Sequence, residues 1–236
     1  MKKIIALLAI FGFCSCAELQ TIADNMPQTG VFSSDADIAA GLRQALDQGI
    51  EEQVTKLTQE NGFYGNNLVK ILLPTELQKV DQTLRDFGLG DLADEGLKVL
   101  NRAAEDAVKE ATPIFVDAVK GITFSDAKNI LLGNDTAATN YLERQTSAVL
   151  YSKFNPQIKT SLDKVGANQI WSNIIQKYNS LPLTSDVNPD LTDYVTQEAL
   201  EGVFTMIAVE EKDIRNNISA RTTDLLRRIF AMQDHQ

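Results

Sequence analysis

The chain has 236 residues, with 22 basic and 32 acidic side chains, a formal net charge of −10 and a single histidine. Hydrophobic residues make up 44% and charged residues 23%, which is typical of a folded globular protein and not of a disordered one. The acidic balance argues against nucleic acid as a partner, because phosphate binding requires clustered lysine and arginine. Two cysteines exclude a disulfide framework, and one histidine excludes histidine-rich metal sites. We expect no metal and no cofactor.

The first fifteen residues have the pattern of an export signal. Lys2 and Lys3 precede an apolar run over residues 4–13. Ten residues rise only about 15 Å as a helix, about half of the hydrocarbon core of a bilayer, so the run predicts a signal peptide and not a membrane span. It ends in Phe13-Cys14-Ser15-Cys16, which resembles the lipobox of bacterial lipoproteins. Cys16 is the better acceptor because a small residue precedes it. The alternative is an ordinary secreted protein that is cleaved just after Ala17.

Lipidation at Cys16 would anchor the mature chain to a membrane, since two acyl chains suffice for stable attachment. Residues 16–33 lack hydrophobic periodicity and predict a flexible tether with a reach of about 20–25 Å. Ala17 follows the anchor where bacterial sorting rules would place Asp for retention, which favours the outer membrane of a Gram-negative cell, facing the periplasm. Removal of residues 1–15 moves the net charge from −10 to −12. Anionic headgroups repel such a domain, so the attachment would depend on the lipid alone.

From Ser34 onward, apolar residues recur at intervals of three and four, which predicts helices almost to the end of the chain. The first predicted helix has about 25 residues, begins with Ser34 as its N-cap and stops before Asn61-Gly62. The next begins at Pro74-Thr75 and ends at Gly88. Between these two helices, residues 67–73 form a short apolar stretch and are the one strand candidate.

The remaining pattern is also helical. A segment runs in helical phase from Leu97 to Ile122 across Pro113, which either caps a new helix or kinks a continuous one. Further helices are expected after Ser125-Asp126, from residue 135 or 136 towards Pro156, over residues 156–165 and 168–179, from Thr192 past Met206, and after Thr222 as a cap. Residues 181–190 contain two prolines and predict a loop. The expected fold is a single all-α domain over residues 34–232, a multi-helix bundle or orthogonal helical array, with a frayed tail over residues 233–236.

Short segments spread over nearly the whole mature chain carry a likeness to a known family. They include Gly41-Leu-Arg-Gln-Ala-Leu46, Asn101-Arg-Ala-Ala-Glu105, Thr123-Phe-Ser-Asp-Ala127, Ile130-Leu-Leu-Gly133 and Arg221-Thr-Thr-Asp-Leu-Leu226. In these segments the chain resembles the bacterial domain-of-unknown-function family numbered 4197. The resemblance implies a helical, exported, often lipid-anchored protein of unassigned activity. It transfers no catalytic residue.

The sequence lacks the patterns of common catalytic motifs. Gly88-Leu-Gly90 follows no predicted strand and is therefore no dinucleotide-binding loop, and no Walker motif is present. His235 lies in the expected frayed tail, so the serines have no histidine to activate them. A nucleophilic cysteine is excluded if Cys16 is acylated.

Carboxylates are the one catalytic class that stays open. Glu105 and Asp126 lie around an alanine-rich segment, and Glu211 lies close in sequence to Arg215 and Arg221. We expect Asp126 to act as a cap or first-turn residue, and Glu211 and Arg215 to form a surface or partly buried ion pair at i,i+4 spacing. A hydrolase or lyase would instead need two carboxylates about 5–10 Å apart in one cleft.

Two aromatic residues stand out because glycines flank them. Phe63 and Tyr64 lie in Asn61-Gly-Phe-Tyr-Gly65, a turn that could present both rings for recognition. Core packing is the alternative, as for the other aromatic residues of the chain.

The leading functional hypothesis is a non-enzymatic, membrane-anchored helical domain that binds an envelope protein or a small ligand. The alternatives are a carboxylate-dependent hydrolase or lyase, and a carrier of an apolar ligand, which would need an internal cavity on the order of several hundred Å³. The candidate contact residues for a ligand or partner are Phe63, Tyr64, Glu105, Asp126, Arg215 and Arg221.

Overall fold

The computed structural model describes residues 34–73, 78, 82, 85–88, 90–180, 188 and 190–233. Residues Ser34–Gln236 form one compact unit, distinct from Met1–Ser33. Several expectations fall outside the described residues: the signal peptide, Cys16 and the tether, the helix start at Pro74-Thr75, most of the 181–190 loop, and His235 in the tail.

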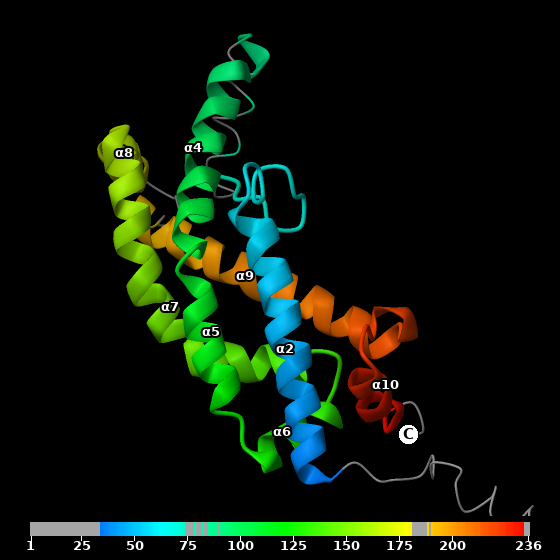
Figure 1. Ribbon diagram of the computed structural model, residues 1–236. Coiled ribbons are helices and arrows are strands. Elements are labelled where there is room, and N and C mark those ends of the chain that lie inside the picture. Colours follow the sequence, from blue (N-terminus) through cyan, green and yellow to red (C-terminus); the bar gives the residue numbers. More distant parts are fainter. Residues whose placement is uncertain are drawn as a thin grey trace, which may run out of the picture. The chain divides into compact units, whose positions relative to one another are not determined.

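The described residues form eight α-helices and one 3-10 helix, and they contain no strand (Figure 1). The α-helices are α2 (Asp35–Thr58), α4 (Gly90–Val108), α5 (Ala111–Lys120), α6 (Phe124–Leu131), α7 (Ala137–Lys164), α8 (Ala167–Asn179), α9 (Leu191–Asn216) and α10 (Asp224–Ala231), and the 3-10 helix η2 is Ile218–Ala220. The predicted all-α class is confirmed. The strand candidate at residues 67–73 lies instead in turns and irregular backbone. Within the described part, no helix is both long and apolar enough to cross a bilayer.

Helix α2 follows its sequence pattern closely. Ser34 is its N-cap: the Ser34 hydroxyl accepts from the Asp37 N–H at 3.2 Å, and the Asp37 carboxylate accepts from the Ser34 N–H at 3.0 Å. This reciprocal pair satisfies two N–H groups that the first helical turn leaves open. The helix ends at Thr58, and Lys56 in its last turn complements the helix dipole.

Helix α7 differs from the expectation, because it does not stop at Pro156. It is one continuous helix of 28 residues with Pro156 in its interior. Four fully buried side chains at a spacing of four continue through the proline: Leu150, Phe154, Ile158 and Leu162. This apolar stripe packs into the core, and its burial outweighs the hydrogen bond that a proline removes.

Two helix starts also lie at other residues than expected. Thr123, and not Ser125, is the N-cap of α6, and Asp126 completes its capping box. Thr223 caps α10, while the expected cap Thr222 donates to Gln48 on α2 at 3.1 Å. Of the two alternatives at Pro113, the structure has the new helix, because α5 begins at residue 111. Its proline therefore lies in the first turn, where the missing N–H is not needed.

The long helices share one apolar core. Helix α7 packs against α4, α5 and α9, and α2 packs against α5, α6, α9 and α10. Figure 1 shows α9 crossing α2, with α10 beside α2. At the centre, the rings of Phe115 on α5 and Phe204 on α9 meet edge to face, with centroids 5.9 Å apart, a preferred aromatic geometry.

Gly202 of α9 permits the closest approach of a loop to this core. The Phe63 ring from the loop after α2 is fully buried, and a Cβ at position 202 would lie 2.6 Å from its Cε1 atom. Any side chain there would displace the ring. Glycine in α9 thus positions the loop against the helix, at some cost in helix propensity.

A polar network connects residues 151–155 of α7 with residues 193–196 of α9. The Tyr151 hydroxyl donates to Asp193 at 2.6 Å, and Asn155 donates to the Tyr151 oxygen and to Thr196, both at 3.3 Å. The hydrogen bond to Asp193, burial and the nearby carboxylate charge raise the pKa of Tyr151 to about 12. Ionisation of the phenol would place two negative charges in contact.

Replacement of Gly202 tests the packing of the loop. We expect Gly202→Ala to lower the free energy of unfolding by about 1–2 kcal/mol, because overlap with the Phe63 ring outweighs the gain in helix propensity. The control is Gly96→Ala in α4, where no atom lies within 4 Å of the added Cβ. It should stabilise the protein by about 0.5–1 kcal/mol. Urea unfolding followed by circular dichroism measures both, and a stabilising Gly202→Ala would contradict the close contact.

The raised pKa of Tyr151 predicts that the protein loses stability at high pH. Its pKa is raised from 10.0 to about 12 in the folded protein, so its contribution is fully present below pH 10 and is lost as the pH rises through 12. The free energy of unfolding of Tyr151→Phe should fall less over this range than that of the wild type. Absorbance titration should show one phenol near pH 12 that is absent from Tyr151→Phe and retained in Tyr64→Phe. Titration of every tyrosine near pH 10 would contradict the hydrogen bond to Asp193.

Candidate functional site

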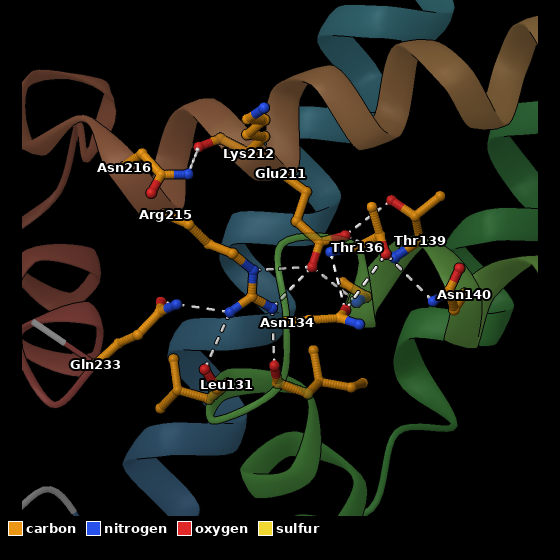
Figure 2. Close-up of polar contacts among 12 residues, drawn as sticks. Leu131, Asn134, Thr136, Thr139, Asn140, Glu211, Lys212, Arg215, Asn216 and Gln233 are labelled. Atoms are coloured by element: carbon orange, nitrogen blue, oxygen red, sulfur yellow. Dashed lines mark hydrogen bonds and ion pairs between the residues drawn. The ribbon is translucent and has the colours of Figure 1, made fainter. Parts of the chain in front are cut away.

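The most connected polar cluster is built on a buried ion pair in α9. The Glu211 carboxylate and the Arg215 guanidinium lie one turn apart, with side chains only 6% and 1% exposed. Glu211 Oε1 accepts from Arg215 Nη2 at 2.7 Å and from Nε at 3.0 Å (Figure 2). The i,i+4 pairing follows the sequence spacing, but the pair lies in the interior and not at the surface.

The Glu211 carboxylate caps helix α7, although Glu211 itself belongs to α9. Its Oε1 accepts from the Ala138 N–H at 2.8 Å, and its Oε2 accepts from the N–H and the hydroxyl of Thr139, both at 2.8 Å. Thr136, the N-cap residue of α7, makes no side-chain capping bond. A negative charge at a helix N-terminus is favoured by the helix dipole and satisfies open N–H groups. Glu211 therefore occupies the anion-binding end of α7.

Arg215 caps the end of the preceding helix, α6. Its Nη1 donates to the carbonyl of Leu131 at 3.0 Å and to the Gln233 side chain at 3.3 Å, and its Nη2 donates to the carbonyl of Ile130 at 2.7 Å. With two bonds to Glu211, these contacts use all five N–H donors of the guanidinium. The pair thus binds the end of α6 and the start of α7 to α9 (Figure 2).

Arg221 belongs to the same region. It is 2% exposed, and it donates to the carbonyls of Ile214 and Arg215 at 3.0 and 2.9 Å, at the end of α9. The Phe230 ring lies 5.6 Å from the Arg221 guanidinium and 5.9 Å from that of Arg215. Both arginines are buried in structural contacts. Their expected role as ligand or partner contacts stays a prediction.

Glu105 and Asn101 on α4 hold the loop after α2. Glu105 accepts from the Phe63 N–H at 3.2 Å and from Arg102 at 2.9 Å. Asn101 accepts from the N–H of Ile71 at 2.8 Å and donates to its carbonyl at 2.9 Å. Both side chains are buried, at 3% and 0% exposed. They satisfy backbone groups that the irregular loop would otherwise bury unpaired.

Of the two alternatives for this turn, exposed rings and core packing, Phe63 follows core packing. Its ring is fully buried, because the bond from its N–H to Glu105 and the space at Gly202 draw it inward. Tyr64 is partly exposed and carries the Lys70 amine 3.9 Å from its ring centroid. The flanking glycines indicated a turn, but they gave no signal of the buried partner on α4.

Asp126 has the structural role expected for a first-turn residue of α6. Hydrogen bonds from the Thr123 hydroxyl and N–H lower the pKa of its carboxyl. Glu105, Asp126 and Glu211 therefore each bind a different loop or helix end. The paired-carboxylate hypothesis gains no support from these three residues.

The described part of the chain offers little internal space for a ligand. An apolar cavity between α2, α9 and α10 has a volume of about 30 Å³ and is lined by residues such as Leu42, Ile207 and Phe230. It is roughly the size of one water molecule and does not fit an apolar ligand of the kind that a carrier would hold. Among the residues that the structure describes, no group of three or more His, Cys, Asp or Glu side chains could hold a metal ion.

Comparison with known families agrees with the resemblance noted in the sequence. Residues 33–231 match the model of a family described as a protein of unknown function, DUF4197. No curated protein and no solved structure is significantly similar to the chain.

The buried pair predicts a large and coupled effect on stability. Glu211→Gln and Arg215→Met should each lower the free energy of unfolding by about 3–5 kcal/mol, because each leaves a buried partner or helix end unsatisfied. The double variant should lose less than the sum of the two, by about 0.5–3 kcal/mol. Asp106→Asn removes the exposed pair with Lys109 and should cost no more than about 1 kcal/mol. Urea unfolding measures all four, and strictly additive losses would contradict the coupling.

Proposed function

The chain belongs to the DUF4197 family, whose function is unknown, and from this premise we propose that it is a lipid-anchored protein of the bacterial cell envelope whose helical domain acts by binding a partner. The placement that we propose is the periplasmic face of the outer membrane. The family match covers residues 33–231, and the proposed anchor rests on the residues that precede them.

The anchor is supported by the order of features before residue 17. Two lysines, ten residues of apolar character and a cysteine preceded by Ser15 follow in the order that lipoprotein processing requires. Acylated Cys16 would then become the first residue of the mature chain. An acidic domain gains nothing from anionic headgroups, so the acyl chains would supply the attachment.

Binding is favoured over catalysis by one observation: the candidate acid and base residues are occupied by structural bonds. Glu211 and Arg215 satisfy the ends of two helices, and Glu105 fastens a loop. A general acid or base needs a proton that it can exchange with a substrate in an accessible site. These buried side chains instead support the shape of the domain, which leaves its surface to make functional contacts.

Substitution of each cysteine tests the anchor. Cys16→Ala should abolish incorporation of a labelled fatty acid and move the protein out of the membrane fraction, because the acceptor thiol is lost. Cys14→Ala is the matched control and should retain label and membrane association. A Cys16→Ala protein that is still labelled and still partitions with membranes would overturn the proposal.

A further inference from the structure

A groove between α7 and α9 is the feature of the described surface with the most defined chemistry. It has a volume of about 610 Å³. Its lining residues recur at spacings of three and four along both helices, from residue 136 to 147 on α7 and from 197 to 208 on α9. Each of these spans has twelve residues and rises about 16 Å, so each wall has about three turns. The groove is long enough to hold three turns of another helix.

The floor and the rim of the groove differ in character. Leu200 and Phe204 lie at its floor and are 7% and 8% exposed. Glu143 on α7 and Glu201 on α9 are exposed at its rim, along with hydroxyl and amide side chains. An apolar floor between polar rims is the arrangement by which protein grooves receive the apolar face of an amphipathic helix.

The charge of the groove is negative and is not neutralised within the described residues. Neither Glu143 nor Glu201 takes part in an ion pair there, and no lysine or arginine lines the groove. Some exposed acids elsewhere on the surface pair with lysines one turn away, as Glu52 does with Lys56. Burial raises the pKa of the neighbouring Glu198 carboxyl, and the charge of Glu201 raises it further.

We propose that this groove binds a basic amphipathic helix of another protein. The apolar face of the helix lies on Leu200 and Phe204, and its lysine or arginine side chains lie opposite Glu143 and Glu201. This inference rests on the proposed binding function and names its partner class. Opposite charges at a rim raise the association rate and select against acidic partners.

A labelled peptide provides the direct test. The probe is an 18-residue fluorescein-labelled helix of leucine and lysine, with a leucine and glutamate peptide as its counterpart. The protein is the full mature chain with Cys16→Ser, which removes the lipid and leaves residues 17–236 unchanged. Fluorescence anisotropy should show saturable binding of the basic peptide, weakened by salt, and none of the acidic one.

Two variants locate the binding. Glu143→Gln with Glu201→Gln should weaken binding roughly fivefold to tenfold, as two rim charges are lost. Glu51→Gln with Glu95→Gln removes the same charge from exposed positions outside the groove and should change the Kd less than twofold. Ala208→Arg, at a partly exposed lining position, should abolish binding, with circular dichroism confirming an unchanged fold.

Several outcomes would overturn the inference. Equal weakening by both double variants would mean attraction to net charge alone, and unaltered binding by Ala208→Arg would place the peptide elsewhere. A concentration-dependent dimer that the peptide disrupts would make a second copy the occupant. Cys16-dependent membrane attachment does not involve the groove, so failure here and failure of the anchor are distinguishable.

Discussion

The buried pair of Glu211 and Arg215 is the interaction on which the arrangement of helices depends. A carboxylate and a guanidinium that lose their water are costly, and attraction to each other seldom repays that cost. Here hydrogen bonds to peptide groups offset the cost of desolvation. The carboxylate accepts from the start of α7, and the guanidinium donates to the end of α6. Thr136, the N-cap residue of α7, makes no side-chain capping bond, whereas the Ile130 carbonyl of α6 also accepts from the Gly133 N–H at 3.2 Å. One pair of side chains therefore orients three helices.

Two residues of α4 bind backbone groups in the same way. Asn101 and Glu105, one turn apart on α4, bind the backbone of the loop after α2. In both places a regular helix supplies polar side chains to backbone that has no helical partner. The buried polar residues thus satisfy the hydrogen-bonding groups of the backbone. This use of the chain's acids and amides leaves its exposed carboxylates, such as those along α7 and α9, to define the outer surface.

Local features of the sequence predicted local features of the structure. The spacing of apolar residues and the Ser34 cap located α2, and the absence of strand alternation gave the all-α class. Two helix caps, Thr123 and Thr223, lie only one or two residues from the predicted positions, whereas the larger errors concern residues whose conformation depends on distant partners. Pro156 remains helical because the stripe on either side of it is buried, and Phe63 turns inward because α4 and α9 receive it. The spacing of Glu211 and Arg215 indicated their pairing. It did not indicate their burial, because the helix ends that they bind lie 72–85 positions earlier in the chain.

That separation along the chain affects the order in which contacts form during folding. Glu211 accepts from residues 72 and 73 positions earlier, and Arg215 donates to carbonyls 84 and 85 positions earlier. Contacts between such remote segments form late, because a long loop must close first. The Leu131 carbonyl and the N–H groups of Ala138 and Thr139 consequently lack these partners until the second half of α9 is in place. During synthesis from the N-terminus, these contacts of α6 and α7 can form only after the second half of α9 has been made.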